Sequence, residues 1–245
     1  MYQTEKNTIE FRLWGKYALF SDPLTKMGGE KCSYHIPTYE ALKGVCKSIY
    51  WKPTLIWIVD EVRVMKQIRT QSKGTKLHRY ETEQPDLSYY TFLHDVEYQV
   101  RVHFEFNQHQ PNLKDDWVDG KHFAICNRVL ETGGRQDIFL GTRDCQGYVE
   151  PCVFGEGIGA YDGLDEMAYG LMFHGFDYPD ENGKHELWAR FWRPVLRNGR
   201  IRFERPESIP QEQRKFVRPM TPKTFGINQN VKPNQKEAEE MGVTE

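Results

Sequence analysis

The sequence predicts an α+β fold, in which a ferredoxin-like domain is followed by a small antiparallel β-sheet domain. The first observation is the order strand, helix, strand, strand, helix, strand in the hydrophobic periodicity of residues 9–140, which is typical of ferredoxin-like domains. The second is a change near residue 156 to short alternating stretches separated by turn signals. We therefore expect three parts: a ferredoxin-like domain over 1–155 with a basic hairpin inserted near 63–92, a β-sheet domain over 156–222, and a disordered tail over 223–245.

The first half of the ferredoxin-like pattern is a strand, a helix and a second strand. The first strand is predicted by apolar residues that alternate with polar neighbours: Ile9, Phe11 and Leu13. The helix begins near Pro37 and stops before Pro53. Its apolar stripe consists of Tyr39, Leu42, Val45, Cys46 and Ile49. The continuous apolar run over 55–59 then predicts a central strand.

The second half begins with the clearest alternation of the chain. One face of this predicted strand carries the apolar residues Val96, Tyr98, Val100, Val102, Phe104 and Phe106. A helix follows from Gly120, with Asp119 as its expected N-cap and Gly133-Gly134 at its end. A short strand near 138–140 completes the pattern. Many RNA-binding domains present the open face of such a sheet to RNA, but the fold also hosts other activities.

Beyond residue 156, three alternating stretches predict the small antiparallel sheet: 170–178, 186–192 and 200–203. Turn signals at 180–183 and 198–199 separate these stretches. From Pro206 onward the chain is rich in proline and charge, and we expect 228–245 to be disordered.

The composition limits the possible partners. A formal net charge of −2 over 245 residues excludes a uniformly basic nucleic-acid coat, so any RNA contact must use local patches. The five cysteines show no Cys-x-x-Cys spacing, which argues against structural zinc and a disulfide framework. Since we find no signal peptide and no long apolar run, we expect a cytoplasmic protein without membrane contact.

Lys121 and His122 lie side by side in the first turn of the helix predicted from Gly120. Unpaired backbone amides and the helix dipole favour an anion there. A phosphate at this point would meet a positive charge and a group that exchanges a proton near neutral pH. The spacing alone also fits a solvated surface pair, which is the commoner situation.

Six cations without an intervening acidic residue lie between residues 63 and 79: Arg63, Lys66, Arg69, Lys73, Lys76 and Arg79. The stretch is either a hairpin edge protected against aggregation or a basic arm that follows a phosphate backbone. We favour an anionic partner, because uncompensated like charges repel one another. A second set is less distinctive, because strands commonly point arginine at solvent; it comprises Arg190, Arg193, Arg197, Arg200, Arg202 and Arg205.

Four segments together resemble a known family. They are YALFSDPLTKMGGEK at 17–31, PTYEALKG at 37–44 running into SIYWKPT at 48–54, GKH at 120–122, and GGRQDIFLGTRDCQGYVEP at 133–151. The chain resembles the CRISPR-associated repeat (pre-crRNA) endoribonucleases of type I, subtype C systems. These are Cas protein family five in its Dvulg branch, within the RAMP superfamily. The resemblance runs from about Ile9 to about Pro222, and the motifs keep their order.

The resemblance implies a metal-independent endoribonuclease that cuts CRISPR precursor RNA at the 3′ base of the repeat stem-loop. The ribose 2′-hydroxyl would attack the adjacent phosphate, leaving a 2′,3′-cyclic phosphate and a 5′-hydroxyl. The resemblance further implies that the protein keeps the 5′ handle of the mature crRNA. It would then be a subunit of the Cascade complex, beside the backbone and large subunits. No cofactor is implied.

The resemblance also implies the site residues. A tyrosine at the position of Tyr50, a lysine at that of Lys121 and a histidine at that of His122 form the cleavage site in the family. Which of them is acid and which is base stays open. Without the resemblance, Tyr50 at a helix end would be expected to place its hydroxyl in water.

Glycine-rich loops are the second implied feature, because their backbone amides can approach RNA phosphates. The implied loop and its basic neighbours comprise Gly133, Gly134 and Arg135, then Gly141 with Arg143. Gly28-Gly29, between Lys26 and Lys31, is a similar amide-rich and basic loop by its composition. A helix C-cap explains Gly133-Gly134 equally well, and both explanations can hold.

Two other functions remain open on the sequence alone. The first is a non-catalytic subunit that grips the crRNA handle while another enzyme cuts. The second is a metal-dependent DNA nuclease. We expect no metal site, because the acidic residues do not group into a two-metal pattern. His103 lies on the polar face of a strand, and three other histidines have no partner at ligand spacing: His109, His174 and His185.

Overall fold

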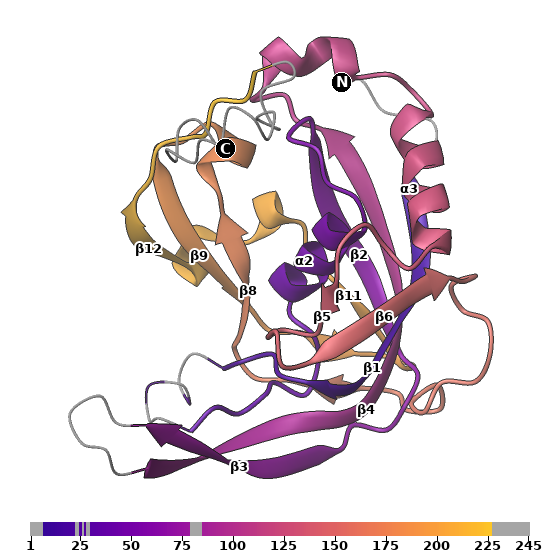
Figure 1. The fold of residues 1–245 in the computed structure, drawn as a ribbon, viewed down its shortest axis with the longest axis vertical. Helices are drawn as coiled ribbons and strands as arrows, with labels where there is room; N and C mark the ends of the chain where they lie inside the picture. The colour runs from indigo at the N-terminus through magenta and orange to yellow at the C-terminus, as the bar shows by residue number, and fades with distance from the viewer. Residues whose placement is uncertain (1–6, 23–24, 26, 28–29, 79–84, 227–245) are drawn as a thin grey trace, which may run out of the picture.

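A seven-stranded sheet forms the centre of the fold (Figure 1). The computed structural model describes residues 7–22, 25, 27, 30–78 and 85–226. The strands of the central sheet are β1 (Thr8–Ala18), β2 (Leu55–Val64), β3 (Thr70–His78), β4 (Pro85–Phe106), β5 (Ile138–Phe139), β6 (Gln146–Pro151) and β11 (Arg200–Arg202). Their order is β11-β2-β4-β1-β6-β5 with β3 paired to β4, and all neighbours are antiparallel. The prediction of an α+β fold is confirmed to the extent that helices and strands are mixed and antiparallel sheets dominate.

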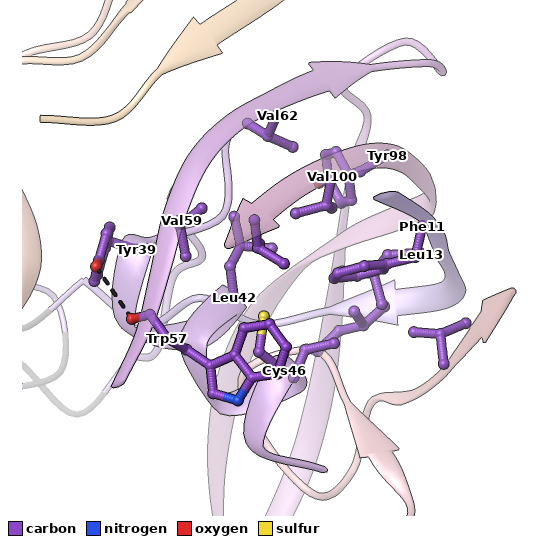
Figure 2. Close-up of a cluster of buried hydrophobic side chains, with 14 of the residues drawn as sticks. Phe11, Leu13, Tyr39, Leu42, Cys46, Trp57, Val59, Val62, Tyr98 and Val100 are labelled. Atoms are coloured by element: carbon purple, nitrogen blue, oxygen red, sulfur yellow. Dashed lines mark hydrogen bonds between the residues drawn. The ribbon is translucent and has the colours of Figure 1, made fainter. Parts of the chain in front are cut away.

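Two helices pack against this sheet. Helix α2 (Tyr39–Ile49) contacts β2, and α3 (Lys121–Glu131) contacts β1 and β6. Their apolar stripes supply buried residues to one core: Leu42 and Cys46 from α2, Cys126 and Leu130 from α3. Figure 2 shows Leu42 and Cys46 among Phe11, Leu13 and Val100 of the sheet. Each of the two helices has 11 residues, and no helix in the described ranges is long and apolar enough to span a membrane.

Helix α2 forms where the apolar stripe predicts it. Thr38, directly after Pro37, is the N-cap, and its hydroxyl accepts from the Ala41 N–H at 3.2 Å. At the other end Tyr50 is already extended, and its N–H donates to the Cys46 carbonyl at 2.9 Å. The chain therefore leaves the helix at Tyr50 in an extended conformation, which sets the direction of the Tyr50 side chain.

A bulge in β2 changes which residues face the core. Val59 pairs with Val102 and Glu61 pairs with Arg101, so that Asp60 is the extra residue. Val59 and Val62 therefore both face the core, although strict alternation would separate them. Glu61 moves to the opposite face of the sheet.

The face opposite the helices is polar and internally paired. Ion pairs join neighbouring strands across it: Arg12–Glu97 at 2.9 Å, Arg101–Glu10 at 2.8 Å and His103–Asp60 at 2.8 Å. The segment after β6 covers part of this face, since the Phe154 N–H donates to Glu10 and the Gly155 N–H to Gln99, both at 2.9 Å.

The C-terminal region differs from the prediction in one strand. Strands β8 (Met172–Asp177), β9 (Glu186–Trp192) and β12 (Arg214–Pro219) form the expected small antiparallel sheet, in the order β12-β9-β8. The stretch 200–203 was expected in the same sheet, but β11 pairs with β2 at the edge of the central sheet. The reason is Ile201, which is fully buried in the main core. Sequence periodicity does not reveal this partner.

Short elements connect the C-terminal strands. Strands β7 (Met167–Ala168) and β10 (Val195–Leu196) form a two-stranded sheet. Helix α4 (Pro179–Asn182) joins β8 to β9, and the 3-10 helices η2 (Pro206–Ser208) and η3 (Gln211–Gln213) precede β12. Residues 223–225, which belong to the predicted tail, contact the body of the protein: the Trp51 and Phe225 rings lie 5.9 Å apart, and Gln110 donates to the Lys223 carbonyl at 3.2 Å. The rest of that tail, 227–245, lies outside the described residues.

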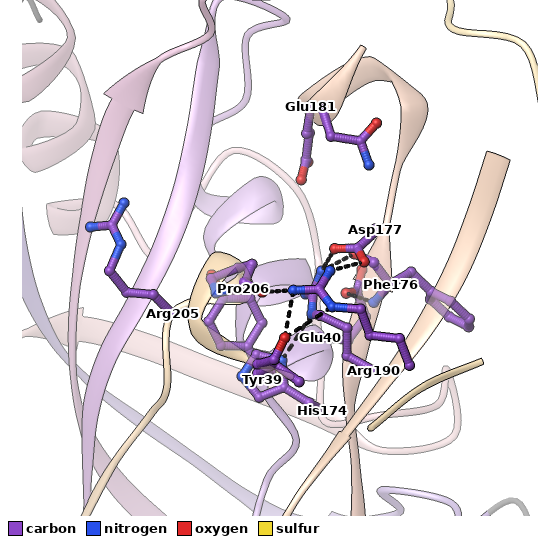
Figure 3. A network of polar contacts seen from close by, with 12 residues as sticks. Tyr39, Glu40, His174, Phe176, Asp177, Glu181, Arg190, Arg205 and Pro206 are labelled. Carbon is purple, nitrogen blue, oxygen red and sulfur yellow. Dashed lines mark hydrogen bonds and ion pairs between the residues drawn. The ribbon is translucent and has the colours of Figure 1, made fainter. Parts of the chain in front are cut away.

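A buried polar network joins α2 to the small sheet (Figure 3). Asp177 forms ion pairs with Arg190 and with Arg214, the latter at 2.5 Å. His174 stacks on Tyr39 with ring centroids 4.3 Å apart and donates from Nε2 to the Glu204 carbonyl at 3.0 Å. Burial lowers the pKa of His174 to about 2, so the ring is neutral. Arg190, a member of the second arginine set, is thus a buried structural residue.

We predict opposite stability effects for two neighbouring positions of α2. Leu42→Ala removes a fully buried side chain and should lower the free energy of unfolding by about 2–5 kcal/mol. Gly44→Ala fills open space on the exposed side of the same helix and should raise it by about 0.5–1 kcal/mol. Urea denaturation followed by circular dichroism measures both. A destabilising Gly44→Ala would contradict the packing of α2 described here.

Candidate functional site

Helix α3 begins one residue later than the sequence suggests. Its N-cap is Gly120, which has a left-handed φ of 71° that glycine adopts without strain. The predicted cap, Asp119, lies outside the helix and its carboxylate accepts from the Gly120 N–H at 3.0 Å. The prediction of Asp119 as N-cap is therefore wrong. An N-cap residue usually has an extended backbone, but the chain enters this helix through the left-handed conformation of Gly120. The placement of Lys121 and His122 in the first turn is confirmed.

His122 is buried beneath the start of the helix, with 1% of its surface exposed. Its Nε2 lies 2.8 Å from the Asp116 carbonyl oxygen, which can only accept, so we assign the ring proton to Nε2 from this network. The free Nδ1 then accepts from the Tyr50 hydroxyl at 3.0 Å. Burial lowers the pKa of His122, so the imidazole is neutral near pH 7. Nδ1 is thus positioned to take up a proton.

Tyr50 does not place its hydroxyl in water, contrary to the expectation from its position at a helix end. The residue is buried, and the Trp57 indole N–H donates to its carbonyl at 2.9 Å. Burial raises the pKa of the Tyr50 hydroxyl to about 12, so it is a neutral donor. Tyr50 and His122 are 72 positions apart in the chain and are joined by a direct hydrogen bond.

Asp116 is the site residue that sequence reasoning missed. It ends the 3-10 helix η1 (Pro111–Asp116), and its Oδ1 lies 2.5 Å from Lys121 Nζ while Oδ2 lies 3.6 Å from His122 Nε2. The Lys121 side chain is 43% exposed and that of Asp116 28%, so solvent weakens the pair to less than about 1 kcal/mol. An acidic residue five positions before a lysine is too common a pattern to single this one out.

Aromatic rings enclose the imidazole. The rings of Phe104 and Phe106 meet His122 edge-on, and Trp117 stacks on Phe106 with centroids 5.7 Å apart. These apolar neighbours cause the desolvation that lowers the histidine pKa. The site therefore has an exposed cation, Lys121, above a buried neutral pair.

No group of three or more His, Cys, Asp or Glu side chains that could hold a metal ion occurs among the residues that the structure describes. The donors around His122 are a phenol, a backbone carbonyl and one carboxylate. This set does not fit a divalent cation, for which hard oxygen cages or several imidazoles are typical.

The predicted basic arm is largely a two-stranded hairpin of β3 and β4 that extends away from the sheet (Figure 1). Arg69 and Lys76 are exposed on it. Lys73 lies over the Tyr17 ring at 3.3 Å and Lys31 over the Tyr90 ring at 4.7 Å. Lys66 pairs with Asp95 at 2.7 Å, an acidic residue distant in sequence from the stretch. Lys26 and Arg79 lie outside the described residues.

Arg63 does not belong with the other cations of this arm. It is 3% exposed, and its guanidinium donates to Asp162 at 2.5 Å and to the carbonyls of Glu156 and Gly157 at 2.9 Å. The bulge in β2 directs Arg63 under the segment after β6. The prediction that Arg63 belongs to the basic arm is therefore corrected, because its guanidinium is bound by groups of the fold itself.

Gly133 and Gly134 close the end of α3. Both have positive φ, and their N–H groups donate to the carbonyls of Leu130 and Val129, each at 3.0 Å. The helix C-cap thus accounts for the amides of both glycines. Arg135 and Arg143 are exposed on the loops beside β5.

Comparison with known proteins gives consistent matches. The family model for CRISPR-associated protein (Cas_Cas5) matches residues 8–204. A CRISPR pre-crRNA endoribonuclease Cas5d of Thermus thermophilus is 36% identical over 197 residues, which cover 76% of this chain and 80% of the relative. A protein of the same name from Mannheimia succiniciproducens is 39% identical over 66 residues, 27% of this chain and 28% of that relative's length.

Two solved structures share the fold. A crystal structure of a CRISPR-associated protein has a TM-score of 0.70 and 33% identity, and the match covers 84% of this chain and 97% of that one. A functionally uncharacterized protein from Streptococcus mutans has a TM-score of 0.70 and 36% identity, covering 83% and 95%. The matched span of the family model includes Tyr50, Lys121 and His122, and the chain belongs to the Cas5 family of CRISPR-associated proteins.

Proposed function

We propose that this protein is a metal-independent endoribonuclease that cleaves CRISPR precursor RNA at the 3′ base of the repeat stem-loop. The observation that carries the proposal is the hydrogen bond between Tyr50 and His122 beside the exposed ammonium of Lys121. Two relatives named CRISPR pre-crRNA endoribonuclease support the substrate class. After cleavage the protein would hold the crRNA 5′ handle in the cytoplasm as a Cascade subunit, as in the type I, subtype C systems that the sequence resembles.

The geometry favours His122 as general base, acting through Tyr50. The ribose 2′-oxygen would give its proton to the Tyr50 oxygen while the Tyr50 proton passes to His122 Nδ1, the acceptor in the structure. The 2′-oxygen would then form a bond to the adjacent phosphorus, and the bond from phosphorus to the 5′-oxygen would break. The departing 5′-oxygen takes a proton from Lys121 or from water. The products are a 2′,3′-cyclic phosphate and a 5′-hydroxyl.

Lys121 would stabilise the negative charge that develops on the phosphate oxygens. In the structure its ammonium is held by Asp116, so the scissile phosphate must compete with that carboxylate. Because the Asp116–Lys121 pair is weak and partly exposed, this exchange costs little.

The RNA surface in this proposal lies on the rims of the molecule. It consists of Lys31, Lys66, Arg69, Lys73 and Lys76 on and beside the hairpin, with Arg135 and Arg143 near β5. Arg63 is omitted because it is buried. Lys26 and Arg79 remain candidates without a described position.

We also propose that the core is ferredoxin-like. The chain order β1, α2, β2, β4, α3, β6 and the sheet order β2-β4-β1-β6 support this assignment. The second unit of our proposal comprises the small sheet of β8, β9 and β12, while β11 joins the first.

A non-catalytic subunit that binds the crRNA handle is the second candidate. The burial of Tyr50 and His122 favours it, because each is 1% exposed and both ring nitrogens of His122 already have partners. In that case the polar cluster would serve only to fix the two helix ends, and purified protein would bind repeat RNA without cutting it.

We predict that His122→Ala lowers the cleavage rate by about 100- to 10,000-fold, because the general base is lost. Affinity for the repeat hairpin should stay within about threefold, since phosphate contacts dominate RNA binding. The assay uses purified protein, its repeat RNA and excess EDTA, with His185→Ala, an exposed histidine, as matched control. Wild-type cleavage by His122→Ala, or loss of all wild-type cleavage in EDTA, would contradict the mechanism.

A second prediction concerns the nucleophile. A single 2′-deoxy sugar just before the cleaved bond should abolish cleavage, because it removes the attacking oxygen. Binding should persist, since every phosphate and every other 2′-hydroxyl remains. The measurement pairs a filter-binding isotherm with a cleavage time course on the same RNA. Efficient cutting of the 2′-deoxy substrate would show that water is the nucleophile.

A further inference from the structure

A cleft of about 700 Å³ lies beside β11, and none of the candidate cleavage-site residues lines it. Four exposed or half-exposed arginines line it together with the buried Trp192: Arg193, Arg197, Arg200 and Arg202. A smaller cleft continues from it, shares Glu61 and Arg202 with it, and adds Arg101 and Arg205. We call the four arginines around the larger cleft the arginine groove.

Two cations of the arginine groove have no ion-pair partner. Arg197 pairs with Glu166 at 3.2 Å, and Arg202 lies 3.6 Å from Glu61. Within the described part of the chain, neither Arg193 nor Arg200 has a carboxylate in ion-pair contact with its guanidinium. Arg200 instead lies over the Phe154 ring at 5.4 Å. The groove therefore offers two guanidinium groups without an ion pair. Three carboxylates also line the cleft, Glu61, Asp162 and Glu204, and the pKa of Asp162 is lowered mainly by its hydrogen bond with Arg63 and also by the charge of Arg200.

The floor of the groove has unused donor capacity as well. The Trp192 indole N–H is buried and has no hydrogen-bond partner in the protein, while its ring stacks on Phe203 with centroids 5.0 Å apart. Buried donors in native proteins are nearly always paired. Trp192 lines the same cleft as Arg193 and Arg200, so the cleft combines an unpaired donor with two guanidinium groups that have no ion-pair partner.

The geometry fits a phosphodiester chain. Arg200 and Arg202 are two residues apart on one strand, so their side chains leave the same face about 6.6 Å apart. The cations that line the larger cleft are all arginines, whose planar fork binds phosphate oxygens in pairs, which lysine cannot do.

The arginine groove is distinct from the site at His122. Strand β2 connects them: the Trp57 indole holds the Tyr50 carbonyl at one end, and Arg63 is paired in register with Arg200 at the other. The six residues from Trp57 to Arg63 span about 20 Å. One RNA strand of several nucleotides can cover this distance.

We propose that the arginine groove binds the phosphate backbone of a single-stranded RNA segment that flanks the repeat hairpin. The inference rests on the proposed function for the identity of the RNA, and it adds a second contact region at the β11 edge. Arg193 and Arg200 supply the phosphate contacts.

The test compares two charge-matched double variants. Arg193→Gln with Arg200→Gln removes the free cations of the groove, and Lys215→Gln with Arg218→Gln removes two exposed cations of β12. Affinity is measured by fluorescence anisotropy on repeat RNA carrying the 2′-deoxy sugar, with and without the single-stranded flank. Thermal unfolding checks that both variants are folded.

The groove variant should bind flanked RNA about tenfold more weakly, with a salt slope smaller by about 1.4 for two lost phosphate contacts. It should bind the bare hairpin like wild type, and the β12 variant should change neither affinity. In ¹⁵N spectra the Trp192 indole signal, assigned with Trp192→Phe, should shift when the flanked RNA is added.

Equal weakening by both double variants would mean a general effect of charge and would overturn the proposal. Displacement of the RNA by polyglutamate at equal charge concentration would also overturn the proposal, because it would show that the groove binds acidic protein segments. Binding is read on RNA that is not cut, so the two proposals fail separately. A wild-type protein that cuts nothing refutes the nuclease alone, and unchanged flank binding by the groove variant refutes the groove alone.

Discussion

The hydrogen bond between the Tyr50 hydroxyl and His122 Nδ1 joins the end of α2 to the start of α3. Both residues are buried, so each polar atom must find a partner inside the protein. The Asp116 carbonyl satisfies the other nitrogen of the ring, and the Trp57 indole satisfies the Tyr50 carbonyl. This requirement fixes the ring tautomer, and Lys121, the residue before His122 in the first turn of α3, is left partly exposed. The chemistry proposed for the site follows from the same contacts that hold the helix ends together.

The two faces of the central sheet explain where nucleic acid can bind. One face is covered by α2 and α3, and the opposite face is spanned by ion pairs such as Arg101–Glu10 and partly covered by the segment after β6. Cations on that face form ion pairs with acidic neighbours. Exposed cations without an ion pair among the described residues remain at the rims, such as Arg69 before the β3–β4 hairpin and Arg200 on β11. A protein with a net charge of −2 can in this way present separate basic surfaces.

Much of the fold was predictable because most of its helices and strands show a local periodicity of apolar residues. The stripe of α2 predicted that helix with nearly correct bounds, and the alternation over 96–106 predicted the second half of β4, which begins already at Pro85. The exceptions depend on long-range partners: β11 leaves the small sheet because Ile201 fits the main core, and Arg63 is buried because Asp162 meets it. Within the site, Lys121 and His122 stood out by their spacing, and Tyr50 by resemblance. Asp116 gave no signal, since its role exists only where η1 folds back onto α3.

The most direct test of the central claim is the pH dependence of single-turnover cleavage. The account requires His122 to be neutral, and burial lowers its pKa below the ordinary value of 6.5. The rate should therefore rise with pH below 6.5, because deprotonation creates the base, and stay level from there to about pH 8. The inflection should vanish in His122→Ala. A rate that falls as pH increases from 5 to 8, or an inflection that survives in His122→Ala, would contradict a neutral His122 as the base.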